Sequence, residues 1–174
     1  QGDAWSGQGD FFGVASNWLA NLRPGDRLPV LVQASSFHPP AEPATPVVMV
    51  AAGAGLAPFR GFMQQRAANW PAGQQPDLLF FGCRDPQADL LYADELAAWQ
   101  ANGVIMLYPA YSRRDGDYVQ AVLWRERAQV LALLDAGASL YVCGEGAKMA
   151  PAVRDSLIRA FAERQGVDQA AAAT

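Results

Sequence analysis

Four short stretches of the sequence carry residues that could do chemistry, and three of them combine glycine, hydroxyl or basic residues in ways that suit a phosphate-bearing ligand. In the first stretch, Gly53, Ala54 and Gly55 precede Pro58. Glycine lets the backbone turn tightly, so that a phosphate can approach the N–H groups at the start of a helix, and proline suits the first turn of that helix. We predict a phosphate cradle here. An ordinary glycine-rich turn is an equal alternative, because the usual dinucleotide fingerprint requires glycine where Pro58 stands.

The second stretch places Arg84 directly before Asp85. A guanidinium group can bind two phosphate oxygens at once, which favours a role for Arg84 in anion binding. A solvated loop charge is the alternative. Domains specific for NAD use an acidic residue near this position to accept the ribose 2′-hydroxyl, but the neighbouring cation argues against that role for Asp85.

The third stretch brings Ser112, Arg113 and Arg114 together, with Tyr118 shortly after them. A hydroxyl and two cations suit a 2′-phosphate, and an aromatic ring can stack on a purine. A polar turn that happens to be basic is the alternative.

The fourth stretch places the thiol of Cys143 at the end of a strand, where a catalytic role is one interpretation. Inert packing in the core is at least an equal alternative, because cysteine is among the most often buried small residues. No Cys or His spacing indicates a metal site, and neither cysteine suggests a disulfide framework. His38, the only histidine, falls in a proline-rich segment and is assigned no role.

Each of these stretches follows a short, continuously apolar run, and each run is followed by a segment with helical character. Continuous apolar runs are typical of strands covered by helices on both faces, and spacings of about 30 residues suit right-handed βαβ crossovers. We therefore predict a doubly wound, parallel α/β sheet with its ligands at the carboxyl ends of the strands. The expected strands are Val47–Ala51, Leu78–Phe81, Val104–Tyr108 and Ser139–Cys143, and the expected helices 57–70, 92–102, 118–136 (broken in the middle) and 148–164.

The residues before this repeat have a different organisation. A helix over 15–22 and an extended piece over 28–33 are joined by a turn at 23–26, and four prolines between Ser35 and Pro46 predict a linker.

Composition restricts the class of protein. The chain has 174 residues, 51% of them apolar, which is enough for one substantial core. A net charge of -4 and the absence of basic runs argue against nucleic acid as a partner. No apolar stretch approaches the length of a membrane helix, and the sparse cysteines fit a reducing cytoplasm. The missing initiator Met suggests an excerpt of a longer protein.

In this order, the segments GVASNWLA, PVVMVAAGAGLAPFRGFMQQR, LLFFGCRDPQADLLYADEL, SRRDGDYVQ and LYVCGEGAKMA resemble the NADPH-cytochrome P-450 reductase (diflavin reductase) family. The resemblance runs from the first residues to about Val167 and is nearest to the reductase part of bacterial proteins that join haem and reductase domains in one chain. It implies a ferredoxin-NADP reductase-like NADP-binding domain over 46–174, lacking the family's C-terminus, and a remnant of the FAD-binding β-barrel with the linker over 1–45. It further implies that hydride passes from NADPH to FAD and that electrons continue through FMN to a P-450 haem, with these domains as partners in the parent chain.

The resemblance also implies roles for individual residues. It places Gly53, Gly55, Pro58 and Arg84 along the pyrophosphate and nicotinamide ribose, and Ser112, Arg113 and Tyr118 around the 2′-phosphate and adenine. It places Cys143 and Glu145, the expected catalytic pair, beside the nicotinamide, with Met149 closing the pocket. Gly13, Val14, Ala15 and Ser16 correspond to a loop over the FAD pyrophosphate.

The sequence departs from the family pattern at three places. Ala54 replaces the usual Thr near the nicotinamide, and Gly116 replaces a Lys near the 2′-phosphate, for which Arg114 would substitute. The upstream flavin motif and the C-terminal acidic residue and tryptophan are absent, so this piece alone should bind NADP(H) without catalysing. A non-redox nucleotide-binding or regulatory domain on the same fold is the alternative, whereas an NAD-specific short dehydrogenase is disfavoured because no Tyr-x-x-x-Lys pair occurs.

Overall fold

The computed structural model describes residues 2–3, 10–11, 13–71 and 73–172. The chain divides into two compact units, 1–36 and 37–174. In the first, β1 (Gly2–Asp3) pairs antiparallel with β2 (Asp10–Phe11), and α1 (Val14–Ala20) follows. The predicted turn is closed by a bond of 3.0 Å from the Asp26 N–H to the Arg23 carbonyl, and the predicted extended piece over 28–33 forms no strand. Residues 1, 4–9 and 12 of the expected flavin-domain remnant lie outside the described residues.

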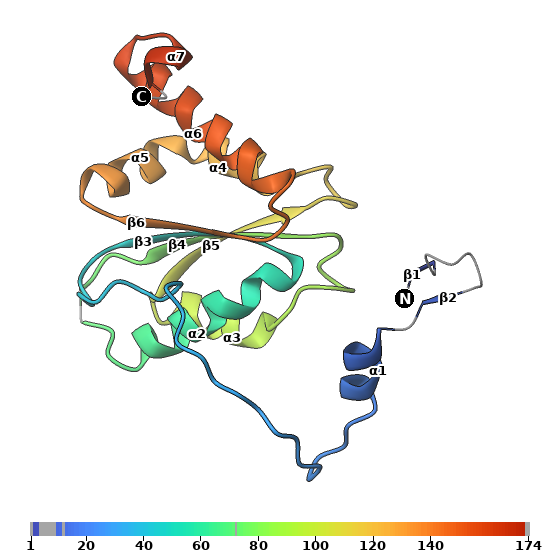
Figure 1. The fold of residues 1–174 in the computed structure, drawn as a ribbon. Helices are drawn as coiled ribbons and strands as arrows, with labels where there is room; N and C mark the ends of the chain where they lie inside the picture. The colour runs from blue at the N-terminus through green and yellow to red at the C-terminus, as the bar shows by residue number, and fades with distance from the viewer. Residues whose placement is uncertain (1, 4–9, 12, 72, 173–174) are drawn as a thin grey trace. The chain divides into compact units, whose positions relative to one another are not determined.

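The second unit is built on a parallel sheet in the order β5-β4-β3-β6 (Figure 1). Its strands are β3 (Val47–Ala52), β4 (Asp77–Cys83), β5 (Ile105–Tyr111) and β6 (Ser139–Cys143). Both neighbours of β3, namely β4 and β6, run parallel to it. The chain thus leaves the centre of the sheet first toward β4 and β5 and later toward β6. This confirms the predicted doubly wound sheet and puts its topological switch point between β3 and β6.

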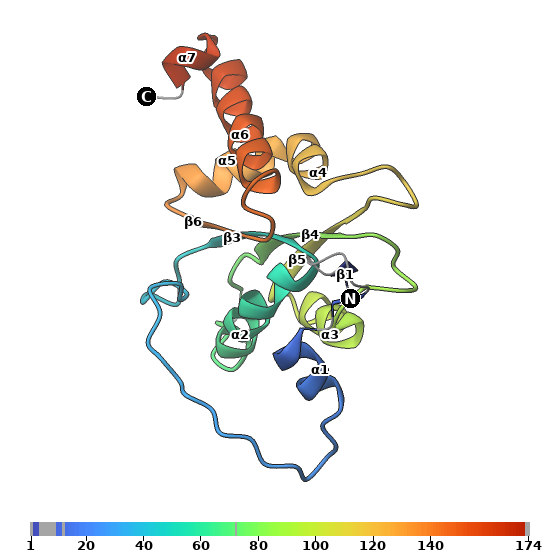
Figure 2. The ribbon, with the colours of Figure 1, turned by 45° about the vertical axis from the view of Figure 1, so that its right-hand side comes forward.

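Helices cover both faces of this sheet, as Figures 1 and 2 show. The short 3₁₀ turn η1 (Gly53–Gly55) leads into α2 (Leu56–Ala67), which lies with α3 (Ala93–Ala101) on one face. The other face carries α4 (Val119–Arg125), α5 (Arg127–Asp135) and α6 (Met149–Gln165), and α7 (Gln169–Ala172) follows α6. The break expected in the third helix occurs at Glu126, between α4 and α5. None of the described helices combines the length and the hydropathy that a bilayer crossing requires.

The residues of β3 show why the apolar runs are continuous. Val47, Met49 and Ala51 pack toward α2, whereas Val48 and Val50 pack toward α4 to α6, and all five side chains are fully buried. Because successive side chains of a strand point to opposite faces, a strand buried on both faces cannot alternate between apolar and polar residues.

A buried ion pair joins α2 to the start of β4. The Arg66 guanidinium donates to the Asp77 carboxylate at 2.5 and 3.0 Å, and the same carboxylate accepts the Val47 N–H at 2.9 Å. Arg66 also donates to the Thr45 carbonyl at 3.1 Å. These contacts tie the beginnings of β3 and β4 together at the amino edge of the sheet.

The proline-rich segment is packed against the second unit from Phe37 onward. The Phe37 ring lies 5.7 Å from that of Phe59, 5.5 Å from that of Phe62 and 5.5 Å from that of Tyr141. Aromatic pairs at such separations are attractive. The segment therefore covers the α2 side of the sheet next to β6.

Candidate functional site

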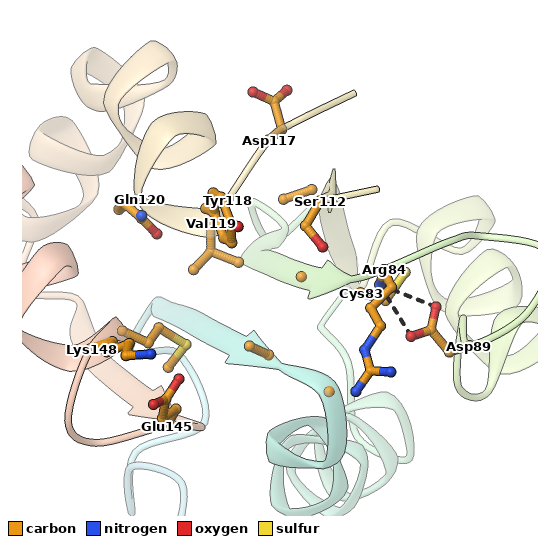
Figure 3. Close-up of a pocket in the computed structure, with 15 residues that line it drawn as sticks. Cys83, Arg84, Asp89, Ser112, Asp117, Tyr118, Val119, Gln120, Glu145 and Lys148 are labelled. Atoms are coloured by element: carbon orange, nitrogen blue, oxygen red, sulfur yellow. Dashed lines mark hydrogen bonds between the residues drawn. The ribbon is translucent and has the colours of Figure 1, made fainter. Parts of the chain in front are cut away.

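A cleft of about 600 Å³ lies at the carboxyl ends of the strands (Figure 3). A volume of this size is typical of small-molecule and cofactor sites. Its walls come from the ends of β3, β4 and β5, the start of α4 and the loop before α6. The lining residues are Ala52, Gly53, Gly82, Cys83, Arg84, Asp89, Ala110, Ser112, Asp117, Tyr118, Val119, Gln120, Glu145, Lys148 and Met149.

After β4, the Asp89 carboxylate binds the backbone of the loop, and Arg84 lines the cleft. The Asp89 carboxylate accepts the Arg84 N–H at 3.1 Å (Figure 3) and the Asp85 N–H at 2.7 Å. These hydrogen bonds from the main chain lower the pKa of Asp89. The Arg84 side chain has no ion pair within the described residues. Its guanidinium is therefore available to an anion in the cleft.

After β5, main-chain bonds hold the expected 2′-phosphate loop against β4. The Ser112 N–H donates to the Cys83 carbonyl at 3.0 Å, and the Arg113 N–H donates to the Arg84 carbonyl at 3.0 Å. Ser112 and Tyr118 both line the cleft, and Tyr118 is 59% exposed, which leaves its ring open to stacking. The fixed loop thus presents a hydroxyl and an aromatic ring to the same hollow.

The two arginines of this loop are placed differently from Ser112, since neither lines the cleft. Arg114 donates to Asp115 at 2.8 and 2.7 Å, and its guanidinium lies 4.2 Å from the centre of the Tyr111 ring. Arg113 is exposed, and no partner for its side chain occurs in the described part of the chain. Arg113 is thus the loop cation that remains unpaired, whereas Arg114 is engaged.

A second aspartate of the loop is also neutralised. Arg125, the last residue of α4, donates to both carboxylate oxygens of Asp117 at 3.0 and 2.6 Å. This hydrogen bonding lowers the pKa of Asp117, which lines the cleft directly before Tyr118.

The glycines of the β3–α2 turn serve two different purposes. Gly53 lines the cleft with φ of 54°, a conformation that side-chain-bearing residues rarely adopt. Gly55 does not line it; a Cβ atom on Gly55 would lie 2.1 Å from the Cys143 carbonyl oxygen. Ala54 and Pro58 also lie outside the lining, with Pro58 in the first turn of α2. Close packing of the turn against the end of β6 explains Gly55 without a ligand.

After β6, the structure separates the two residues expected beside a nicotinamide. Glu145 lines the cleft together with Met149, whereas Cys143 does not and packs against the core on the α2 side. The other free cysteine, Cys83, does line the cleft. Burial is the main cause that raises the pKa of Cys83 to about 11, so its thiol stays protonated at neutral pH.

Sequence reasoning missed several lining residues, above all Lys148, Asp89 and Asp117. Lys148 precedes the predicted pocket residue Met149 at the start of α6, and its position after the fourth strand was a usable signal. The two aspartates gave no such signal, because their partners become known only from the fold. No group of three or more potential metal ligands occurs among the residues that the structure describes.

The matches to known proteins agree with the parallel α/β fold. Residues 49–155 match the family model described as "Oxidoreductase NAD-binding domain". The chain is 43% identical over 173 residues to a bifunctional cytochrome P450/NADPH--P450 reductase of Bacillus cereus, covering 95% of this chain and 16% of that protein. It is 47% identical over 174 residues to a self-sufficient cytochrome P450 monooxygenase of Phanerodontia chrysosporium, covering 94% of this chain and 16% of that protein.

A third relative is a bifunctional cytochrome P450/NADPH--P450 reductase of Fusarium oxysporum, 45% identical over 169 residues, covering 91% of this chain and 16% of that protein. The chain therefore spans about a sixth of the length of these curated relatives. Nearly the whole chain takes part in each match, and the family model covers more than half of it. The chain belongs to the oxidoreductase NAD-binding domain family.

Proposed function

We propose that the chain is the NADP(H)-binding module of a diflavin oxidoreductase. In the parent protein, hydride would pass from NADPH to FAD, and electrons would continue through FMN to a cytochrome P-450 haem. The named relatives that join P450 and NADPH--P450 reductase in one protein support this proposal. The parent chain's flavin and haem domains are the partners that it implies, and a cytoplasmic location stays a prediction.

One observation carries the nucleotide-binding part of the proposal: a single cleft at the switch point gathers groups suited to each part of NADP(H). Arg84 and Lys148 offer cations for phosphate oxygens, Ser112 offers a hydroxyl, and Tyr118 offers a ring for the adenine. Of the lining residues, Glu145 is nearest along the chain to the expected nicotinamide residue Cys143, and Lys148 and Met149 follow it. We propose that Arg113 reaches the 2′-phosphate from the rim of the cleft.

The direct test compares 2′,5′-ADP with 5′-AMP, which differ by the 2′-phosphate. A charge-assisted hydrogen bond contributes about 1.5 to 3 kcal/mol, so each such contact gives roughly tenfold to hundredfold preference for 2′,5′-ADP. With Gly116 in place of a cation, we expect the total near the low end. Ser112→Ala and Arg113→Ala should each weaken 2′,5′-ADP binding while leaving 5′-AMP binding nearly unchanged, as measured by calorimetric titration.

Arg154→Ala is the matched control, because Arg154 is an exposed arginine of α6 whose removal changes the net charge equally. This variant should keep the wild-type preference. Equal binding of the two nucleotides by the wild-type chain would contradict the assignment and favour the alternative, a non-redox nucleotide-binding domain.

FAD binding by Gly13, Val14, Ala15 and Ser16 is a separate part of the proposal. Gly13 is the N-cap of α1, a helix of 7 residues that begins with Val14, Ala15 and Ser16, and Val14 is 85% exposed. In the described part of residues 1–36, a two-residue strand pair and α1 are too little to enclose a flavin. We propose that these residues contribute only a rim contact to FAD and do not form a complete site.

We therefore expect the chain to purify without stoichiometric flavin, because flavin affinity depends on enclosing the ring. An absorbance scan of the purified chain from 300 to about 550 nm, with release by heat and quantification of any flavin, provides the measurement. One bound flavin per chain would show that residues 1–36 hold more of the flavin site than proposed.

A further inference from the structure

We infer that the Arg125–Asp117 ion pair sets the coenzyme preference of the cleft, with Arg125 as a positioning residue that acts through Asp117. The inference rests on the proposed function, because it assumes that the ribose end of the nucleotide lies beside Ser112 and Tyr118. It adds a determinant from α4, outside the loop that carries the expected 2′-phosphate ligands.

The Asp117 carboxylate belongs to the same cleft lining as Ser112, the expected 2′-phosphate ligand. Asp117 lines the cleft, directly precedes Tyr118, and shares the lining with Ser112 (Figure 3). Its side chain is 29% exposed, so water screens its charge only in part. An unpaired carboxylate at this position would repel a phosphate that carries nearly two negative charges.

The same carboxylate would favour the other coenzyme. An acidic residue near the adenine ribose accepts a hydrogen bond from the 2′-hydroxyl of NAD. Asp117 could therefore select against NADP(H) unless its oxygens were already occupied.

Arg125 occupies both oxygens at once. Its Nη1 and Nη2 atoms donate to the two Asp117 oxygens at 3.0 and 2.6 Å, a forked arrangement that a lysine cannot reproduce. The two residues are eight positions apart, across the entry into α4, and the hydrogen bond from Arg125 lowers the pKa of Asp117. Arg125 thus neutralises Asp117 and engages both of its carboxylate oxygens.

The loop contains a second arginine–aspartate pair of the same kind. Arg114 pairs with both oxygens of Asp115 at 2.8 and 2.7 Å. With both aspartates paired, Arg113 is left as the uncompensated charge of the loop from Ser112 to Tyr118. These ion pairs neutralise the acidic residues beside the expected phosphate site, so that a phosphate can bind there.

The experiment measures the affinities of the 174-residue chain for 2′,5′-ADP and 5′-AMP by calorimetry, and compares their ratio among variants. Arg125→Ala should lower the ratio about tenfold or more, mainly by weakening 2′,5′-ADP binding. Arg125→Lys should give an intermediate ratio. The double variant Arg125→Ala with Asp117→Asn should recover most of the wild-type ratio, because the repelling charge is gone.

Two further variants control for the loss of a positive charge and for poor folding of Arg125→Ala. Arg127→Ala removes an arginine two positions away that pairs with Glu163 at 3.0 Å, and it should leave the ratio unchanged. Asp117→Asn alone should keep or raise the ratio, and it tests the inference even if Arg125→Ala folds poorly; a fall in its ratio would overturn the inference.

Other results distinguish a failure of this inference from a failure of the proposed function. A wild-type preference for 2′,5′-ADP that survives Arg125→Ala overturns the inference alone. A double variant as impaired as Arg125→Ala also overturns it, because Arg125 would then contact the phosphate itself. Equal affinities of the wild-type chain for both nucleotides overturn the proposed function and this inference together.

Discussion

Asp77→Ala should lower the free energy of unfolding by about 3 to 5 kcal/mol, because breaking a buried ion pair leaves the other charge buried without compensation. Asp77 is 1% exposed and Arg66 is 7% exposed. The substitution also removes the acceptor of the buried Val47 N–H. Urea unfolding followed by circular dichroism measures the change. Because burial raises the pKa of Asp77 to about 6, the measurement belongs at about pH 8, where the carboxylate is ionised.

An exposed ion pair of similar geometry provides the control. Arg164 donates to Asp135 at 2.5 Å, but the two side chains are 37% and 58% exposed. Asp135→Ala should cost less than about 1 kcal/mol, as surface pairs do. If Asp77→Ala is no more destabilising than Asp135→Ala, the buried pair does not hold the strands as described. Asp77→Leu with Arg66→Met should recover much of the loss, since it removes both charges together.

Gly55→Ala should destabilise the chain by about 3 kcal/mol and weaken binding of 2′,5′-ADP, because the added methyl group collides with backbone rather than with a movable side chain. The new Cβ would lie 2.1 Å from the Cys143 carbonyl oxygen, 2.6 Å from its carbon and 3.0 Å from the Gly144 Cα. Gly55 itself has φ of -61°, which alanine adopts readily, so the whole penalty is steric. Urea unfolding and nucleotide titration measure the two effects.

Gly61→Ala is the matched control for this substitution. Gly61 lies inside α2, and a Cβ atom there would meet nothing within 4 Å. Alanine is favoured over glycine in a helix by up to about 1 kcal/mol, so this variant should be neutral or stabilising. Equal behaviour of the two variants would show that the turn and the end of β6 move apart freely, contrary to the close packing described.

The sheet was well predicted from the sequence, because burial on both faces requires continuous apolar runs, which are visible in the sequence. The predicted and observed bounds of β6 coincide at Ser139–Cys143, and β3 differs by one residue. β4 begins earlier than predicted, at Asp77, because its polar side chain is buried in an ion pair. β5 continues past Pro109 to Tyr111, which is possible because β5 is an edge strand that tolerates a missing N–H donor.

The site was less predictable, for a physical reason. Spacing along the chain showed which residues follow the strands, and Gly53, Arg84, Ser112, Tyr118, Glu145 and Met149 do line one cleft. It could not show which charges are already paired. The pairing of Asp117 with Arg125 depends on how α4 leaves the loop, and the close approach of Gly55 to Cys143 depends on the parallel pairing of β3 with β6. Such contacts arise from the fold, so residue type alone does not reveal them.

The order of strands in the sheet also has a consequence for how the domain folds. Paired residues of β3 and β4, such as Val48 and Leu78, are 30 positions apart, whereas Val48 and its partner Leu140 on β6 are 92 apart. By loop-closure entropy, pairing β3 with β6 costs about 1 kcal/mol more than pairing β3 with β4. During synthesis on a ribosome, β3, β4 and β5 can pair once Tyr111 has emerged. The part of the cleft wall that follows β6 can form only after Met149 has also emerged. The cleft is thus completed after most of the sheet that supports it.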